Sequence, residues 1–481
     1  MVYGMGTIIP RFLNYAVLTP FYTRIFTDTR DYGIVTEIYA WMVLLLVLLT
    51  YGMETGFFRF VQNKEETDRV FSTALISLLL TSVAFIILIN VFIRPVSVLM
   101  NYKNNQDYIR YFAFIVAIDA FTAIPFARLR HENKALIFST IKLINVLITL
   151  VMVLFLLQIA PGIYQKSNGW FRNIYDPGYK VGYIFVANLV SSFATLIMLI
   201  PIICKTKFVF DSGLWRRMVL YSYPLLLAGL SGTINDAIDK ILLRRLSAGD
   251  DALSIVGKYG AAYKIGVLMA IFIQMFRFAA EPFFFERAKY ANAKETYAFV
   301  MKYFIIAMLV LYLCINLYIS GIQYIIGKNY RDAIIIVPII SMGYLLYGVY
   351  INHSIWYKIS DLTRYAVYIT FIGAAITLII NILFIPVLGY MASAWAHVIS
   401  YGTMIVVSFN FSYKHYRVSY NMLKLLPYFL IAVFMVIFGQ FFEYPNLYTE
   451  LAVNTVFIIV FISYAQYKDK ILTIFLTKKA I

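Results

Sequence analysis

The residues of this sequence that could do chemistry are charged side chains set inside long apolar segments. They are Arg11, Glu37, Glu54, Arg59, Asp119, Asp236, Asp239, Lys240, Lys264, Arg277 and Glu281, with Arg24 near the end of an apolar segment. A charged side chain at bilayer depth is costly, so it generally faces a water-filled cavity or a partner of opposite charge. The list therefore predicts a polar pathway through a membrane protein.

Two pairs of opposite charge are spaced for local neutralisation. Asp236 and Lys240, and likewise Arg277 and Glu281, are four residues apart, which places both members of a pair on one helix face. Structural pairing and a role in a cavity both remain open for these residues. Asp119 is expected to snorkel or to pair near a span end.

Six basic residues together favour a cationic cavity. They are Arg11, Arg24, Arg59, Lys240, Lys264 and Arg277, which fall on the expected first, second, seventh and eighth spans. Arginine binds phosphate through a bidentate fork, and lysine acts as a point charge. A pyrophosphate on a lipid carrier fits such a cavity, because its charge must be shielded while it crosses the bilayer.

The composition requires a lipid environment. Of the 481 residues, 62% are hydrophobic and 14% are charged, whereas soluble domains are about half apolar and about a quarter charged. Apolar runs such as 38–49, 74–91 and 146–157 do not alternate with polar residues, which excludes a β-barrel. A segment that spans lipid must satisfy its own backbone hydrogen bonds. We therefore predict an all-α, polytopic membrane protein.

We expect about 14 transmembrane helices, joined by short loops, with no independent soluble domain. The expected spans are 4–26, 34–60, 70–93, 108–128, 135–158, 180–203, 218–245, 255–280, 300–326, 333–357, 365–386, 389–412, 425–442 and 447–467. The first apolar segment has no small-residue cleavage site, so the first span is expected to be an uncleaved insertion signal.

Alternate loops differ in their content of Lys and Arg. The richer set includes Lys64, Arg128, Arg130, Lys134, Lys205, Arg216, Arg287, Lys358, Lys414, Lys478 and Lys479. The positive-inside rule makes this set cytoplasmic, together with both termini. The same rule explains most of the net charge of +17, and a cationic cavity for an anionic substrate explains the remainder.

A weak internal repeat suggests two lobes. Thr23-Arg24-Ile25-Phe26 precedes Asp31-Tyr32-Gly33, and Leu243-Arg244-Arg245-Leu246 precedes Gly257-Lys258-Tyr259-Gly260. In both places a span ends on arginine and a Tyr-Gly or Gly-Lys-Tyr-Gly segment follows. We therefore predict a six-helix lobe at 1–210 and a second at 211–415, with the substrate site between them. Two further helices and a cytoplasmic tail occupy 416–481.

The longest outer loop, 160–179, is predicted to consist of turns at Pro161-Gly162, Asn168-Gly169 and Asp176-Pro177-Gly178. Its aromatic residues fit a belt at the lipid headgroups or a surface that stacks on sugar rings, and both interpretations remain open. The two cysteines and four histidines are scattered, so no disulfide framework, metal site or catalytic cluster is predicted.

Short motifs along nearly the whole chain carry a family resemblance. They are Leu18-Thr19-Pro20, Thr23-Arg24-Ile25-Phe26, Asp31-Tyr32-Gly33, Gly52-Met53-Glu54-Thr55-Gly56-Phe57-Phe58-Arg59-Phe60, Pro125-Phe126-Ala127-Arg128-Leu129-Arg130, Tyr223-Pro224-Leu225, Ile238-Asp239-Lys240, Gly257-Lys258-Tyr259, Phe278-Ala279-Ala280-Glu281-Pro282-Phe283, Asn381-Ile382-Leu383-Phe384-Ile385-Pro386, Gly389-Tyr390 and Ala392-Ser393-Ala394-Trp395-Ala396. In their order and spacing they resemble bacterial polysaccharide or O-antigen flippases of the multidrug/oligosaccharidyl-lipid/polysaccharide exporter superfamily.

The resemblance implies a flippase rather than an enzyme. It implies that an undecaprenyl-pyrophosphate-linked oligosaccharide crosses the bacterial inner membrane by alternating access, for lipopolysaccharide or other surface polysaccharide. Arg24, Arg59, Asp239 and Lys240 stand in the matching motifs as substrate-binding residues; Arg11, Lys264 and Arg277 are added from their depth. No cofactor is implied. Coupling to a proton or sodium gradient is common in the superfamily, and other polysaccharide assembly proteins are candidate partners.

Three rival functions remain open. The first is a multidrug or cation antiporter of the same superfamily, which the absence of an acidic residue before Asp28 disfavours. The second is a lipid II flippase, whose mechanism would be similar. The third is a membrane-embedded polymerase or ligase, which the outer loop 160–179 disfavours because it holds no histidine and only one acidic residue, Asp176.

Overall fold

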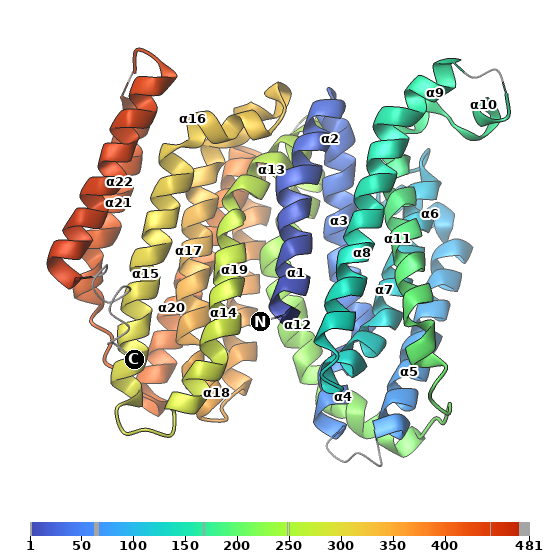
Figure 1. The fold of residues 1–481 in the computed structure, drawn as a ribbon, viewed down its shortest axis with the longest axis horizontal. Coiled ribbons are helices and arrows are strands. Elements are labelled where there is room, and N and C mark those ends of the chain that lie inside the picture. The colour runs from blue at the N-terminus through green and yellow to red at the C-terminus, as the bar shows by residue number, and fades with distance from the viewer. Residues whose placement is uncertain are drawn as a thin grey trace. The chain divides into compact units, whose positions relative to one another are not determined.

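The chain is helical almost throughout. The computed structural model describes residues 2–61, 67–166, 169–247, 249, 251–442 and 444–470, and it contains no strand within these ranges (Figure 1). The all-α fold class is therefore confirmed. Lys64, Lys478 and Lys479, which contributed to the predicted topology, lie outside the described residues, as does Asn168 of the outer loop.

The helices have the following bounds. The first half of the chain forms α1 (Val2–Leu13), α2 (Thr19–Ile25), α3 (Thr29–Thr50), α4 (Met53–Phe60), α5 (Thr67–Val91), α6 (Ile93–Leu99), α7 (Gln106–His131), α8 (Ala135–Leu154), α9 (Ala160–Lys166), α10 (Phe171–Ile174), α11 (Lys180–Ile203) and α12 (Ser212–Leu246). The second half forms α13 (Ala252–Gly266), α14 (Leu268–Arg287), α15 (Ala293–Leu317), α16 (Ile319–Ile322), α17 (Val337–His353), α18 (Ile355–Ile359), α19 (Arg364–Leu388), α20 (Tyr390–His415), α21 (Met422–Phe441) and α22 (Leu447–Asp469).

Twelve helical segments within the described ranges are long and apolar enough to cross a membrane. The expected first and seventh spans are also helical, in α1–α2 and in α12, but polar residues keep them outside this set of twelve. The 35 residues of α12 extend over about 52 Å, longer than the roughly 30 Å of a hydrocarbon core. The expected number of about 14 spans thus agrees with the structure, and the two most polar spans carry four of the predicted site residues.

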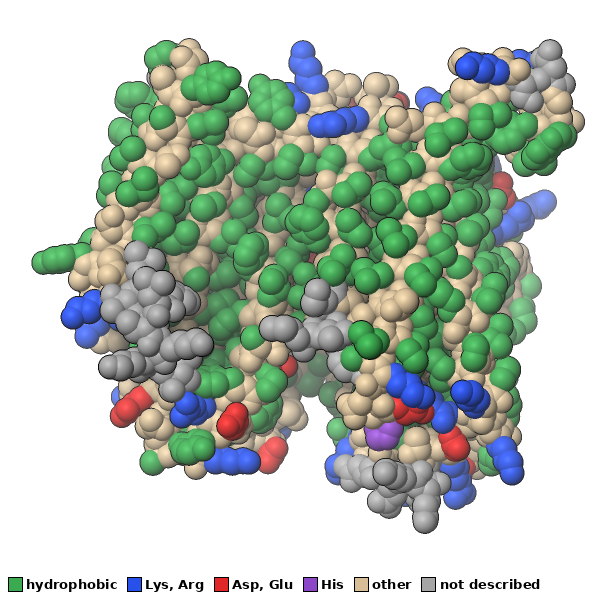
Figure 2. Space-filling view, in the orientation of Figure 1, with side chains coloured by type: hydrophobic (Ala, Val, Ile, Leu, Met, Phe, Trp, Pro, Cys, Tyr) green, Lys and Arg blue, Asp and Glu red, His purple; other side chains and the backbone are tan. Residues whose placement is uncertain are grey.

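Apolar side chains cover the middle of the helices on the face seen in Figure 2, and Lys, Arg, Asp and Glu gather towards the helix ends. This distribution is the one that a bilayer imposes, because only the helix ends reach the headgroups and water. Together with the apolar helices, it identifies a multi-pass membrane protein.

The residues divide into two compact units. Unit 1 contains Met1–Asn14 and Arg30–Arg244, and unit 2 contains Tyr15–Thr29 and Arg245–Ile481. The first span therefore changes unit within a π-helical turn that covers Asn14–Leu18. Such turns widen a helix locally and are frequent at functional sites.

The seventh span belongs to unit 1 over most of its length. Gly52 and Gly56, which flank the start of α4, let that segment approach Ser222 of α12 so closely that a Cβ on either glycine would press against Ser222. Farther along, Ala237 and Ile241 of α12 form a buried cluster with α3. The units thus divide the chain at different residues from the lobes expected at 1–210 and 211–415, and those lobes stay a prediction.

The C-terminal helix pair packs on α15 within unit 2. At one end of the pair, Lys302 of α15 and Tyr428 of α21 both contact the carboxylate of Asp469 at the end of α22. Tyr303 donates to the backbone carbonyl of Asp469 at 3.0 Å. These bonds fix α21 and α22 to the body of unit 2.

The outer loop is more helical than the sequence predicts. Pro161 and Gly162 lie inside α9, so the turn expected there is wrong, since proline is tolerated in the first turn of a helix. The turn at Asp176-Pro177-Gly178 is confirmed, and the Asp176 carboxylate accepts from the backbone N–H of Gly178 at 2.8 Å. Tyr175 stacks on Tyr183 with ring centroids 4.9 Å apart.

Candidate functional site

The seven predicted site residues are distributed over both compact units. Unit 1 holds Arg11, Arg59, Asp239 and Lys240, and unit 2 holds Arg24, Lys264 and Arg277. Each unit is described by itself below, starting from the elements that position these side chains.

Arg59 is exposed on α4, close to the end of the second span. The span breaks before α4 because Gly52 adopts φ 70°, a left-handed conformation that glycine adopts without strain. Helix α4 then buries Met53, Gly56 and Phe57 and leaves Arg59 outside. Within the described ranges, Arg59 has no hydrogen-bond or ion-pair partner, so its guanidinium is available to a ligand.

Two further cations of unit 1 lie on the neighbouring helices. Arg130 of α7 pairs with Glu54 of α4 at 2.5 Å, and its guanidinium lies 5.2 Å from the centre of the Phe58 ring. Lys142 of α8 lies 4.1 Å from the centre of the Phe126 ring. A cation held against an aromatic face keeps its charge while losing part of its water.

Asp119 lies in the middle of α7 rather than near a span end, so the expectation that it snorkels is wrong. Its carboxylate accepts a hydrogen bond from Ser192 of α11 at 2.9 Å. One helix away, Asn145 of α8 donates to the Thr195 hydroxyl at 2.9 Å. Unit 1 therefore contains a polar layer between α7, α8 and α11, well inside its apolar helices.

Asp239 and Lys240 form an adjacent ion pair on α12. The Lys240 ammonium donates to the Asp239 carboxylate at 2.9 Å and to the backbone carbonyl of Asp236 at 2.8 Å. Asp239 is 1% exposed and Lys240 8% exposed. The Lys240 ammonium thus contacts its sequence neighbour Asp239 as well as Asp236, the residue to which the i,i+4 spacing pointed.

A second buried carboxylate lies where α12 meets α3. Glu37 is fully buried, accepts from the Tyr102 hydroxyl at 2.6 Å, and lies 3.8 Å from Nε of Arg244. Tyr102 belongs to the loop between α6 and α7, so three separate segments of unit 1 meet at Glu37. The buried charge is compensated by hydrogen bonding and by the nearby guanidinium.

In unit 2, the end of the first span is bound to the loop after α16. Arg24 donates to the backbone carbonyl of Tyr324 at 3.1 Å. The Gly327 N–H donates to the Thr23 hydroxyl at 3.1 Å, and the Tyr330 hydroxyl donates to the backbone carbonyl of Phe26 at 2.9 Å. Arg24 remains exposed in this arrangement.

The other two predicted cations of unit 2 lie on α13 and α14. The Lys264 ammonium lies 4.6 Å from the centre of the Tyr15 ring. Glu281 pairs with Lys358 of α18, so the expected Arg277–Glu281 pair does not form. Arg277 is half-buried, and its Nε has no hydrogen-bond partner within the described ranges.

These observations can be set beside known proteins. The family described as "Polysaccharide biosynthesis protein" matches residues 1–288. The chain belongs to this family. A search of curated protein sequences finds no significant match.

Comparison with solved structures identifies the fold of this family member. The chain is similar to a lipid II flippase, MurJ, in an inward closed conformation, with a TM-score of 0.73 and 16% identity over 97% of this chain and 98% of that chain. It is also similar to an inward-facing multidrug resistance MATE transporter of the MOP superfamily, with a TM-score of 0.65 and 15% identity over 86% and 94% of the two chains. At these identities, the likeness establishes a shared fold.

Sequence reasoning missed Lys142 of this polysaccharide biosynthesis family member. A single lysine inside the apolar stretch 135–158 was a readable signal, because such a charge is costly unless it has a function or a partner. Arg130 was assigned to a cytoplasmic loop, and the structure instead shows it in α7, held between Glu54 and Phe58.

Proposed function

We propose that this protein is a flippase that moves an undecaprenyl-pyrophosphate-linked oligosaccharide across the bacterial inner membrane for surface polysaccharide such as O-antigen. Arg11, Arg24, Arg59, Asp239, Lys240, Lys264 and Arg277 are its proposed substrate-binding residues, and both termini are cytoplasmic. Membership of the polysaccharide biosynthesis family supports the substrate class. The transporter fold supports the type of activity.

The observation that carries the proposal is that Arg59 is exposed on α4. Stability poorly explains an exposed guanidinium that has no hydrogen-bond or ion-pair partner within the described ranges, because it contributes neither packing nor a hydrogen bond there. It is well explained by an anionic ligand that binds and leaves. Arg59 stands at the expected cytoplasmic end of the second span, where a substrate made in the cytoplasm would first bind.

The change of unit within the first span supports alternating access. Residues up to Asn14 belong to unit 1 and those from Tyr15 to unit 2, and the intervening turn is π-helical. We propose that this turn is a hinge at which the first span bends when the two units move. A π-helical turn suits a hinge because its hydrogen bonds are already shifted from the regular helical pattern.

The experiment is complementation in a strain that lacks the protein, with lipid-linked intermediates measured in its membranes. Arg59→Ala should abolish surface polysaccharide and accumulate lipid-linked oligosaccharide at normal protein abundance. Loss of a charge-assisted hydrogen bond to the substrate costs about 1.5–3 kcal/mol, or more than about tenfold in binding. Arg59→Lys should retain part of the activity, because it keeps the charge but loses the fork.

Arg110→Ala is the matched control. Arg110 is an exposed arginine that pairs, within the described ranges, with Asp107 on its own helix, and the two side chains are 46% and 56% exposed. That variant should remain fully active. Normal polysaccharide in both Arg24→Ala and Arg59→Ala would reject the proposal.

A lipid II flippase is the second candidate, because the similarity to MurJ extends over 97% of the chain. Rescue of a strain depleted of lipid II flippase would favour it. A multidrug antiporter is the third, because unit 1 carries the acidic Asp119 inside α7. Robust efflux of cationic dyes, lost in Asp119→Asn, would favour that function and reject the proposed one.

A further inference from the structure

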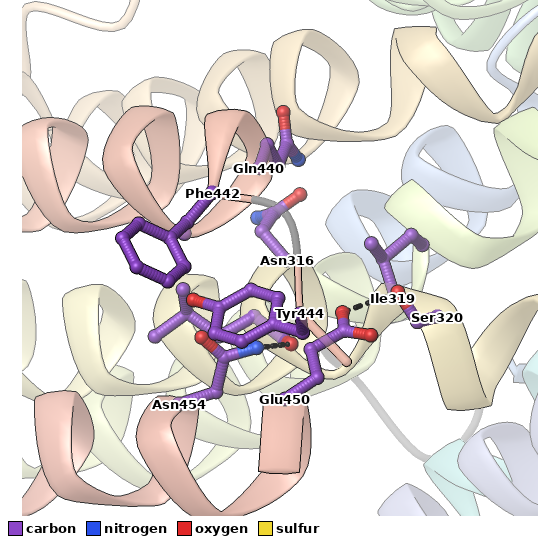
Figure 3. Close-up of a pocket in the computed structure, with 10 residues that line it drawn as sticks. Asn316, Ile319, Ser320, Gln440, Phe442, Tyr444, Glu450 and Asn454 are labelled. Carbon is purple, nitrogen blue, oxygen red and sulfur yellow. Dashed lines mark hydrogen bonds between the residues drawn. The ribbon is translucent and has the colours of Figure 1, made fainter. Parts of the chain in front are cut away.

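A polar cavity of 260 Å³ lies among four elements at one end of unit 2. Its walls come from the end of α15, from α16, from the end of α21 and from the first turns of α22. The polar side chains around it are Asn316, Ser320, Gln440, Tyr444, Glu450 and Asn454 (Figure 3). By the predicted topology this end is the outer one, at the level of the lipid headgroups.

Two buried asparagines at this cavity have their amide orientation fixed by their other contacts. Asn316 is fully buried and donates from Nδ2 to the backbone carbonyl of Tyr312 at 2.7 Å. Asn454 is 1% exposed and donates from Nδ2 to the backbone carbonyl of Leu317 at 2.6 Å. A carbonyl can only accept, so a flipped amide would place oxygen against oxygen in either case.

Because Nδ2 of each amide is bound in this way, Oδ1 is the atom that still needs a hydrogen-bond donor. Neither Oδ1 of Asn316 nor Oδ1 of Asn454 has a hydrogen-bond partner within the described ranges, and neither has the hydroxyl of Tyr444. A buried acceptor without a donor costs about 1–3 kcal/mol. Two such acceptors on the wall of one cavity point to an occupant that donates hydrogen bonds or carries positive charge.

The charge of the cavity agrees with this requirement. Glu450 accepts from the Ser320 hydroxyl, and it stands in the first turn of α22, at the positive end of the helix dipole. No lysine or arginine lines the cavity among the described residues. The described lining residues therefore present one carboxylate and several neutral oxygens.

We propose that this cavity binds a monovalent cation, with Glu450 as its counter-charge and Asn316 and Asn454 as neutral oxygen ligands. Carboxylate, amide and hydroxyl oxygens suit hard cations rather than transition metals. Dedicated calcium sites generally use several carboxylates, whereas Glu450 is the one carboxylate among the described lining residues. A bare ion would not fill 260 Å³, so the cation enters either as partly hydrated Na⁺ or as the primary ammonium of an ethanolamine lipid headgroup.

This proposal does not depend on the flippase proposal, and its test uses the purified full-length protein in detergent. Binding of radioactive Na⁺ should be saturable. Glu450→Gln should weaken it by about tenfold or more, because the counter-charge is lost. Tyr444→Phe, which keeps the ring and the fold, should weaken it by about threefold to tenfold.

The matched control is Glu295→Gln. Glu295 is an exposed acidic residue in the first turn of α15, at the other end of a helix that lines the cavity. That variant should bind Na⁺ as the wild type does. An equal loss in Glu295→Gln would mean that Glu450 has no specific role and would overturn the site.

The second arm distinguishes the two sources of the cation. The protein is purified with ethanolamine, choline and glycerol lipids, and retained lipid is measured by native mass spectrometry. Retention of ethanolamine lipid in the wild type but not in Glu450→Gln supports the ammonium source, since a choline headgroup cannot donate hydrogen bonds. Saturable Na⁺ binding without lipid preference supports the metal ion. Absence of both would show that water fills the cavity, and the proposal would fall.

Discussion

Arg128 should be a structural residue, in contrast to the functional role proposed for Arg59. Its side chain is 13% exposed at the end of α7. The guanidinium donates to Glu132 at 2.6 Å, to Asp68 of α5 at 2.8 Å, and to the Thr206 hydroxyl beyond α11. It thereby joins three segments of unit 1, and Arg128→Ala should destabilise the protein.

The magnitude follows from the exposure of each partner. The bond to Glu132, which is 25% exposed, is charge-assisted and contributes about 1.5–3 kcal/mol. The pair with Asp68, which is 62% exposed, contributes about 0–1 kcal/mol. The guanidinium also lies 4.5 Å from the centre of the Phe71 ring, a cation–π contact of about 0.5–1 kcal/mol. We expect a total loss of about 3 kcal/mol for Arg128→Ala.

The assay is the free energy of unfolding of purified protein in mixed micelles, followed by tryptophan fluorescence. Arg128→Lys should lose about half as much, because an ammonium cannot reach three partners as a guanidinium fork does. Arg110→Ala, whose pair is exposed, should change stability by less than about 1 kcal/mol. If Arg128→Ala is no less stable than Arg110→Ala, the reasoning from buried charge-assisted bonds is refuted.

The pH dependence provides a second readout for Arg128. Burial alone would raise the pKa of Glu132, but hydrogen bonds from Arg128 and Lys134 outweigh it and lower the pKa below its usual value. The stabilisation is therefore present above the usual pKa of glutamate, and it is lost as the pH falls through the lowered pKa of the folded state. Arg128→Ala should remove part of this acid sensitivity.

Two further predictions concern backbone and helix ends. Gly327→Ala should destabilise unit 2 by about 1–3 kcal/mol, because the new Cβ would overlap a backbone oxygen of α2. Gly321→Ala should change stability by less than about 0.5 kcal/mol, because the space around its Cβ is open. Equal thermal stability of the two variants would contradict this prediction. The backbone N–H of Leu214 and the guanidinium of Arg69 lower the pKa of Asp211, so its contribution is present above the usual pKa of aspartate and is lost as the pH falls through the lowered one. Asp211→Asn, which can still cap α12, should flatten that part of the acid unfolding curve, and an unchanged curve would refute the assignment.

The local sequence determined the fold class and most of the spans. Apolar runs too long for a soluble core can be satisfied only in lipid, and a span must then be helical. Both conditions act over about 20 consecutive residues, so they can be read without tertiary contacts. The exposure of Arg59 follows similarly from α4, in which Met53, Gly56 and Phe57 form the buried face.

The ion-pair partners of the charged residues were much less predictable from the sequence than the positions of these residues within the spans. Spacing pointed Lys240 towards Asp236 but not towards Asp239, whose carboxylate Lys240 also contacts. Spacing also pointed Arg277 towards Glu281, which pairs with Lys358. Helical spacing gives the neighbours along one helix, but a charge inside a bundle takes the partner that the packing of all helices brings closest. Lys358 belongs to α18, and nothing in the local sequence relates it to α14.

Only the tertiary structure decided how distant segments meet. The first span ends in unit 2 because Thr23, Arg24 and Phe26 are hydrogen-bonded to a segment about 300 residues away. The cavity at Glu450 exists because α15, α16, α21 and α22 converge there, which leaves the amide oxygens of Asn316 and Asn454 without donors. An unsatisfied acceptor is a property of three-dimensional packing, since every asparagine in the printed sequence carries the same groups and only its surroundings decide which of them remain unpaired.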